Sequence, residues 1–148
     1  YTGAILENIK FPNSGGIKVA AGNTACTVVA SNSTFTDISF SGGNESFCPL
    51  KMSNCNIKSL TMSYAYGFKL SNVEVESSIT LSNMYVNPNG VCGFSNVSSA
   101  SFTGIISYGT GDLTLTSPSV KSEIVCYFGS VNIPRYSYYN NVILGGAP

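Results

Sequence analysis

Two glutamates, Glu74 and Glu76, stand two positions apart and are the side chains best placed to support catalysis. Glycoside hydrolysis needs two carboxyl groups about 5–10 Å apart, and two residues on one face of a β-strand lie about 7 Å apart. Val73 and Val75 alternate with the glutamates, and this alternation predicts that the valines face the core. We therefore expect both glutamates on a solvated outer face, without a catalytic role.

Residue types that the chain lacks restrict its other chemistry. It contains no histidine, which excludes Ser-His-Asp and Cys-His nucleophiles and most zinc and copper sites. The segment 109–111 has too few glycines for a phosphate-binding loop, and Asp37, Asp112 and Glu123 are too isolated for a calcium motif. The sequence predicts no catalytic residue, no metal ligand and no cofactor.

The charge balance excludes some partners and favours an extracellular location. Seven basic and seven acidic residues cancel and are scattered, so no nucleic-acid partner is expected. Charged residues make up 9% of the chain, against about 25% in a typical soluble domain. A surface with few titrating groups suits a protein that is secreted or displayed on a cell or virion. No apolar run is long enough for membrane insertion.

Three N-glycosylation sequons support this location. They begin at Asn32, Asn44 and Asn96. Asn44 is expected to be the best acceptor, because the preceding segment 41–43 is rich in glycine and predicts an exposed loop.

A cluster near the C-terminus is a candidate contact surface for a partner or a glycan. It comprises Arg135, Tyr136, Tyr138 and Tyr139. Tyrosines on a β surface can stack on sugar rings or become buried against a partner.

One short pattern, apolar-x-apolar-Ser-Asn, recurs five times in the first two thirds of the chain. It occupies residues 28–32, 50–54, 68–72, 79–83 and 92–96. With residue 83 taken as a second corner within one coil, the spacings are 22, 18 and 24 residues, which suits one coil of a β-solenoid. The two apolar positions of each copy would face the core. Ser-Asn would form a corner, because asparagine tolerates left-handed backbone, and stacked asparagines could form an inward-facing amide ladder.

The flanking strands show the alternation that this geometry requires. Apolar residues occupy the even positions from Leu60 to Leu70 and then the odd positions 73, 75, 79 and 81, so the phase changes after Asn72. Tyr64 and Tyr66 share the even phase and are expected in the core.

The segments 31–40, 53–62 and 71–81 resemble coils of right-handed parallel β-helices of the pectin-lyase-like type. The resemblance covers roughly residues 17–106 and implies an all-β solenoid. That family contains polysaccharide lyases and hydrolases as well as adhesins and surface proteins, and none of its catalytic residues has a counterpart here. An antiparallel β-sandwich is the alternative fold. We expect one domain over residues 1–148, in which residues 109–148 form a cap or a separate strand layer.

The coil alignment also bears on the five cysteines, Cys26, Cys48, Cys55, Cys92 and Cys126. Cys26 and Cys48 each lie six residues before a corner asparagine, so they would stack on adjacent coils within disulfide range. The odd number leaves one thiol buried or available for an intermolecular bond. Asn32 and Asn96 create a conflict, because an inward-facing ladder residue cannot carry a glycan.

These features predict a non-enzymatic, extracellular structural or adhesive protein: a filament, surface-layer or virion-spike subunit. Its terminal strands lack charged residues that would discourage pairing, so identical subunits would join head to tail through Ile5, Leu6, Val142, Ile143 and Leu144. The alternative is a carbohydrate-binding module or a small polysaccharide lyase or hydrolase.

Overall fold

The computed structural model shows an all-β chain in which stacked parallel coils surround one core. It describes residues 3–7, 16–22, 27–42, 49–65, 67–84, 92–106, 109–116, 123–126, 130–132 and 141–144. The strands of this part are β1 (Gly3–Glu7), β2 (Ile17–Gly22), β3 (Thr27–Ser31), β4 (Thr34–Gly42), β5 (Leu50–Ser63), β6 (Phe68–Ser82), β7 (Cys92–Ile106), β8 (Gly109–Leu115), β9 (Glu123–Cys126), β10 (Ser130–Asn132) and β11 (Asn141–Leu144).

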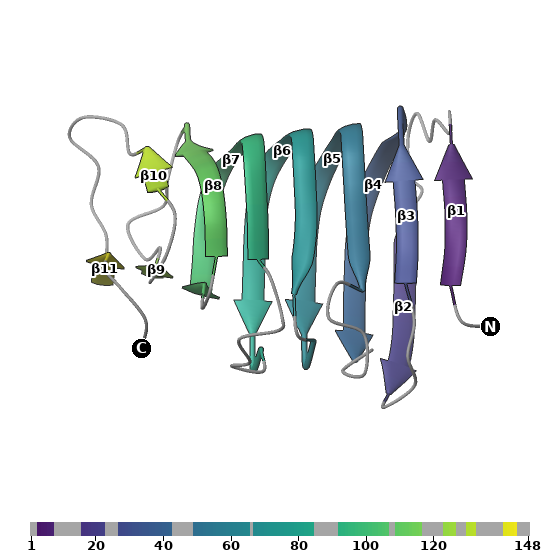
Figure 1. Ribbon diagram of the computed structural model, residues 1–148, viewed down its shortest axis with the longest axis horizontal. Helices are drawn as coiled ribbons and strands as arrows, with labels where there is room; N and C mark the ends of the chain where they lie inside the picture. The colour runs from purple at the N-terminus through teal and green to yellow at the C-terminus, as the bar shows by residue number, and fades with distance from the viewer. Residues whose placement is uncertain are drawn as a thin grey trace.

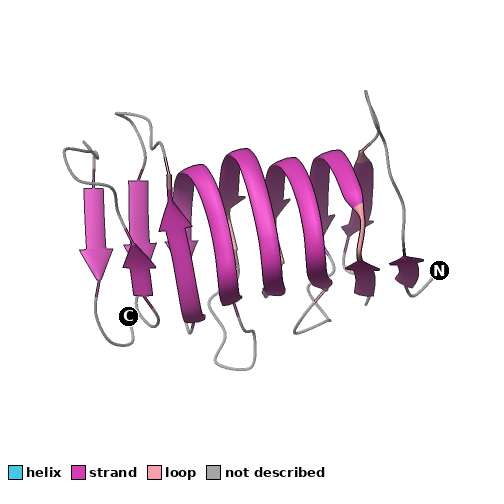
Figure 2. Cartoon of the chain, turned by 90° about the horizontal axis from the view of Figure 1, so that it is seen from above, coloured by secondary structure: helices cyan, strands magenta, loops and turns pink. Residues whose placement is uncertain are grey.

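The strands stack along one long axis, with the N-terminal strands at one end and the C-terminal strands at the other (Figure 1). Every strand pair in the described part is parallel. Figure 2 shows β5, β6 and β7 as successive turns of a coil, each continuing around a corner. Parallel pairing between successive coils is the pattern of a β-solenoid, which confirms the predicted fold class and excludes the antiparallel sandwich.

Three ladders of paired strands run along the solenoid. The first ladder contains β1, β3 and the starts of β5, β6 and β7. The second ladder begins directly after each corner asparagine, where Cys55 pairs with Val73 and Val73 with Val97. The third ladder contains β2, β4, the ends of β5, β6 and β7, and then β9 and β11. These ladders give the solenoid three outer faces.

The five corner asparagines all have left-handed backbone, with φ between 50° and 54° at Asn32, Asn54, Asn72, Asn83 and Asn96. Left-handed backbone is unfavourable for most L-residues, but the short polar side chain of asparagine tolerates it. The corner shifts the phase of the strand, so that Leu70 and Val73 are both buried with two outward residues between them. The predicted change of phase is therefore confirmed.

The core consists of the inward residues of the three ladders. Its largest fully buried side chains include Phe40, Phe68 and Phe102, each at most 1% exposed. Phe68 and Phe94 pack edge to face with ring centroids 5.2 Å apart. Such layers of stacked apolar residues provide the burial that stabilises each coil against its neighbours.

The prediction that Tyr64 belongs to the core is wrong. Residues 60–70 do not form one strand, because β5 ends at Ser63 and β6 begins at Phe68. Tyr64 has a left-handed φ of 55° and is 49% exposed, and the phase changes there so that Ala65 is buried. Gly42, Tyr64 and Asn83 form a second row of left-handed corners. The side chain of Tyr66 lies outside the described residues.

The strands in the last third extend the same ladders rather than forming a separate layer. β8 and β9 both pair with β7, and β10 and β11 continue from them. The uneven repeat of 22, 18 and 24 residues keeps its register in the strands, where Val28, Leu50, Phe68 and Cys92 align. The differences in coil length fall mainly in the connections that follow the third ladder.

Candidate functional site

The corner asparagines of three neighbouring coils form a hydrogen-bonded amide ladder on the outer surface. Asn72 Nδ2 donates to Asn54 Oδ1 at 3.1 Å, and Asn96 Nδ2 donates to Asn72 Oδ1 at 2.9 Å. All three side chains are exposed. The predicted ladder is therefore present, but the prediction that it faces inward is wrong, because the left-handed corner directs the asparagine outward and the next residue inward.

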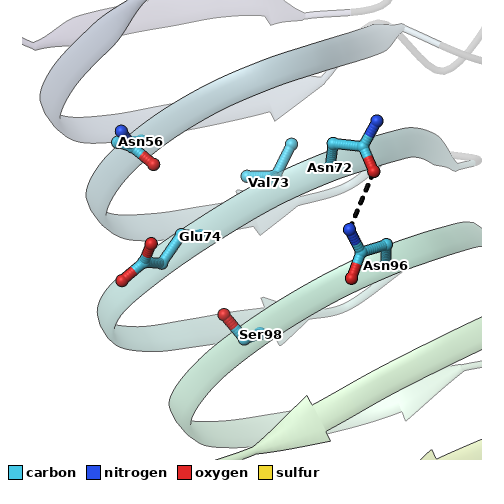
Figure 3. Close-up of a pocket in the computed structure, with 6 residues that line it drawn as sticks. All are labelled: Asn56, Asn72, Val73, Glu74, Asn96 and Ser98. Carbon is cyan, nitrogen blue, oxygen red and sulfur yellow. Dashed lines mark hydrogen bonds between the residues drawn. The ribbon is translucent and has the colours of Figure 1, made fainter.

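A shallow polar groove runs beside this ladder on the outer face of the second ladder (Figure 3). It has a volume of about 230 Å³, which is below the range of about 300–1,000 Å³ typical of drug-sized ligands. The lining residues are Asn56, Asn72, Val73, Glu74, Asn96 and Ser98. The groove therefore offers amides, one hydroxyl and one carboxylate to a ligand no larger than about one sugar ring.

Coil stacking brings the groove residues together. Asn56 aligns with Glu74, and Glu74 aligns with Ser98, because each lies two residues after a corner asparagine. The hydrogen bonds of the ladder use one N–H of Asn72 and one of Asn96, so each amide retains a second N–H. Glu74 adds a carboxylate acceptor on the opposite side of the groove from Asn72 and Asn96 (Figure 3).

Glu74 and Glu76 are both exposed on β6 between the buried Val73 and Val75, which confirms the predicted orientation. Only Glu74 lines the groove. Among the described residues, no three histidine, cysteine or acidic side chains gather as a metal-binding group. The groove therefore supports hydrogen bonding to a neutral ligand better than two-carboxylate chemistry.

Cys55 is the cysteine whose environment is described, and it is an unpaired core residue. Its side chain is 1% exposed, and Sγ donates to the Ser53 carbonyl oxygen at 3.3 Å. Burial raises the pKa of this thiol, and a backbone hydrogen bond from Ser33 offsets part of the rise. A buried, protonated thiol is a poor nucleophile, so Cys55 has a structural role.

Several predicted site residues lie outside the part that the structure describes. These are Cys26, Cys48, Asn44, Arg135, Tyr136, Tyr138 and Tyr139. The Cys26–Cys48 disulfide stays a prediction. Cys26 and Cys48 are 22 residues apart in the sequence, the same separation as the paired residues Val28 and Leu50 of β3 and β5.

Two of the predicted glycosylation sites lie at exposed corners. Asn32 is exposed, and within the described residues its side chain makes no hydrogen bond. Asn96 is exposed as well, but its Nδ2 donates to the ladder. The conflict between the ladder and glycosylation therefore disappears at Asn32, whereas a glycan on Asn96 would replace one N–H of a ladder amide.

The residues predicted to mediate assembly do not share one ladder. Ile5, which is 73% exposed, and Leu6 lie in β1 of the first ladder. Residues 142–144 lie in β11 of the third ladder, whose opposite end is β2. Within the described part, β1, β2, β10 and β11 each pair along one edge.

Sequence reasoning identified the corner asparagines and the outward direction of Glu74, but it missed Asn56 and Ser98. The signal was available, since both lie two positions after a corner asparagine of the repeat. Alignment of these outward positions would have placed them in one row.

The fold and this surface define a parallel β-solenoid with polar outer faces. Comparisons with protein-family models, curated proteins and solved structures found no match to this chain. None of the described segments forms a helix with the length and apolar character that a membrane crossing requires. The function is therefore inferred from the fold and from the chemistry of its surface.

Proposed function

We propose that this chain is a non-enzymatic structural protein of an extracellular surface, assembled head to tail into a filament or spike. The observation that carries the proposal is the phase of the third ladder at its two ends. Val142 of β11 occupies the same register position as Gly104, Leu81, Met62, Phe40 and, in β2, Val19. A second copy translated along the axis could therefore add its β2 beside β11 without a change of phase.

Edge pairing supplies the chemistry of the contact. A strand with one unpaired edge presents N–H and C=O groups to another chain. Pairing β11 with β2 joins two different surfaces, and such heterologous contacts build open filaments or closed rings. The contact would place Val142 over Val19, which packs against the core in register with Phe40.

The composition and surface chemistry support the extracellular part of the proposal. Charged residues make up 9% of the sequence, and the outer corners carry the exposed sequon residues Asn32 and Asn96. Burial and ladder hydrogen bonds stabilise each coil against its neighbours, and neither contribution depends on a titrating side chain.

Cysteine cross-linking tests the contact. Lys18 and Asn141 share one register position at the two ends of the third ladder, so in the assembly their Cα atoms would lie about 4.8 Å apart. We expect the Lys18→Cys/Asn141→Cys chain to form multimers under oxidising conditions that reduction reverses. The matched control is Ile5→Cys/Asn141→Cys, which joins different ladders and should give the background of the parent chain.

Electron microscopy of the uncross-linked parent chain gives the second readout. Regular filaments whose repeat matches one subunit support the proposal. Monodisperse single particles at high concentration, together with no excess of cross-linked multimers over the control, overturn it.

A carbohydrate-binding module is the second candidate, and the groove of about 230 Å³ favours it. Sugar hydroxyls both donate and accept, which suits a groove with the amides of Asn72 and Asn96 on one side and the Glu74 carboxylate on the other. A glycan array should then show binding that Glu74→Gln weakens. Equal binding by the parent and the variant would argue against this groove, and cleavage of a polysaccharide abolished by Glu74→Gln or Glu76→Gln would indicate an enzyme.

A further inference from the structure

The outer face of the third ladder is an array of hydroxyl groups. Among the outward positions of this face on β4, β5, β6 and β7 whose side chains the structure describes, ten of eleven are serine or threonine. We call this set the hydroxyl face; its members are Ser39, Ser41, Ser59, Thr61, Ser63, Ser78, Thr80, Ser82, Ser101 and Thr103. The eleventh position is Asp37, whose carboxylate accepts a hydrogen bond from Ser59.

The array is regular because the register of this ladder is uninterrupted from β4 to β7. The central row aligns Ser39 with Thr61, Thr61 with Thr80, and Thr80 with Thr103. The rows on either side align residues 59, 78 and 101, and residues 41, 63 and 82. The shifts of register between β5 and β6 and between β6 and β7 fall before this face begins.

The hydroxyl groups of the central row are available to an external partner. Within the described residues, Ser39, Thr61, Thr80 and Thr103 make no side-chain hydrogen bond to the protein. Thr61 and Thr103 are exposed, and threonine on a strand has few χ1 rotamers, so its hydroxyl position is well defined. This contrasts with the asparagine ladder, whose amides bond to one another.

The surface beneath the array is rigid. The residues that alternate with the hydroxyl face are Ile38, Phe40, Leu60, Met62, Ile79, Leu81 and Phe102, each at most 5% exposed. Packed apolar side chains and continuous ladder hydrogen bonds hold the hydroxyl groups at fixed positions. Fixed positions matter, because a partner with a lattice of its own can be matched only by a surface that does not rearrange.

The spacing of the hydroxyl groups resembles that of a tetrahedral water network. Neighbouring strands lie about 4.8 Å apart and alternate residues along a strand about 6.7 Å apart. Water oxygens joined by tetrahedral hydrogen bonds of about 2.75 Å have second neighbours about 4.5 Å apart, and hexagonal ice repeats along its axis at eight-thirds of one bond, about 7.3 Å. The strand spacing of about 4.8 Å exceeds the second-neighbour distance of about 4.5 Å by about 0.3 Å. Across the three steps from β4 to β7 this difference adds up to about 0.9 Å, well under one hydrogen-bond length.

We propose that the hydroxyl face binds the surface of ice. A regular lattice of hydroxyl groups on a rigid surface, with a central row that makes no side-chain hydrogen bond within the described residues, orders water at positions that an ice plane also occupies. Charged residues adjoin the face at its ends, since Asp37 aligns with Ser59 and the exposed Lys18 of β2 aligns with Ser39. Glu123 of β9 aligns with Thr103. Lys51 and Lys69 lie instead on the outer face of the first ladder, and Glu74 lies on that of the second ladder. This activity goes beyond the proposed structural role and does not depend on assembly.

Partition into slowly growing ice tests the proposal with the full chain. We expect the parent chain to enter the ice fraction, whereas an inert globular protein stays in the liquid. Thr61→Lys/Thr103→Lys should fall to the level of the inert protein, because two long charged side chains hold the flat face away from the ice. Ser95→Lys adds a charge at an exposed position of the first ladder and should partition like the parent.

A second double variant controls for loss of the fold. Thr61→Val/Thr103→Val keeps the β-branched shape and removes both hydroxyl groups, and unchanged circular dichroism identifies a folded chain. Reduced ice partition by this folded variant supports the hydroxyl array as the binding surface. Exclusion of the parent chain from ice overturns the proposal, as does equal partition of the parent and the Thr61→Lys/Thr103→Lys chain. Binding to crystalline polysaccharide with exclusion from ice also overturns it and assigns the face to a carbohydrate surface.

Discussion

At the residue scale, asparagine combines two properties that the solenoid needs at its corners. It tolerates the left-handed φ found at all five repeat corners, and its amide both donates and accepts along the stack. Tyr64 also has left-handed backbone, with a φ of 55°, although a bulky residue tolerates this conformation less well than asparagine does. Its amide N–H donates to the Ser82 carbonyl oxygen at 3.4 Å, and its hydroxyl accepts from Asn83 Nδ2.

Substitutions of Asn72 separate the contribution of left-handed backbone from that of the amide hydrogen bonds. Asn72→Ala should lower the free energy of unfolding by about 2–3 kcal/mol, since it imposes left-handed strain and removes the ladder bonds. Asn72→Gly removes the ladder bonds without the strain and should cost about 1 kcal/mol less. Urea denaturation measures both, and Asn56→Ala, at an exposed asparagine outside the left-handed corners, should change stability by less than about 0.5 kcal/mol. Equal effects of the alanine and glycine variants would show that backbone strain contributes nothing.

Cys55 predicts an alkaline dependence of stability. Burial raises the pKa of its thiol above the ordinary value of 9.0, so the unfolded chain loses this proton at a lower pH than the folded chain. The contribution to stability is therefore fully present below pH 9.0 and is lost as the pH rises towards the folded pKa, by up to about 1.4 kcal/mol per pH unit. Urea titrations of the parent and Cys55→Ala from about pH 8 to about pH 10 isolate this effect, because other titrating groups are common to both. Parallel pH profiles for the two chains would contradict the prediction.

At the scale of the element, the coils preserve register in the strands and accept variation elsewhere. Residue 104 shows how tightly neighbouring strands constrain one another. Gly104 has a φ of 149°, and a Cβ there would lie 2.7 Å from Leu81 Cβ and 2.9 Å from the Leu81 carbonyl oxygen. Glycine is therefore required at this point of β7, because β6 lies too close for any side chain.

Gly104→Ala should destabilise the protein through both the contact and the backbone. We expect a loss of about 2 kcal/mol or more in the free energy of unfolding. Thr103→Ala, at the exposed adjacent position, should cost less than about 1 kcal/mol. Thermal or urea denaturation compares them, and similar stabilities of the two variants would show that β6 and β7 separate easily at this position.

At the scale of the whole molecule, each coil contacts mainly the coils before and after it. Stability in such a stack is distributed along the axis, and the terminal coils have one neighbour instead of two. The continuous strands β5, β6 and β7 lie in the middle of the stack, whereas β2 and β11 lie at the ends of the third ladder (Figure 1). The two ends should therefore open more readily than the centre.

Amide hydrogen exchange measures this gradient and its change on assembly. In the monomer, exchange should be slowest in β5, β6 and β7 and faster in β2 and β11. Head-to-tail contact between β11 and β2 should slow exchange in these two strands and leave β1 unchanged. Protection of β1 instead would place the contact on the first ladder, and uniform exchange along the monomer would contradict independent opening of the ends.

Much of the fold follows from the sequence alone. Alternating apolar residues define the inward faces, and the Ser-Asn pairs mark the corners, because both depend on local sterics and burial. The alignment of Val28, Leu50 and Phe68, predicted from the repeat, is the register that the ladders adopt. The outward direction of Glu74 and Glu76 followed from the same alternation.

Only the tertiary structure decided three other features. The alternation of residues 60–70 predicted one strand, but stacking against Ser82 and Asn83 places a corner at Tyr64. Whether the asparagine amides face the core or solvent is determined by the sense of the turn at each corner, which a residue pattern does not specify. The groove and the hydroxyl face arise where residues about 20 positions apart align. Their spacing is determined by pairing between coils, a non-local interaction, and therefore by the fold rather than by any single segment.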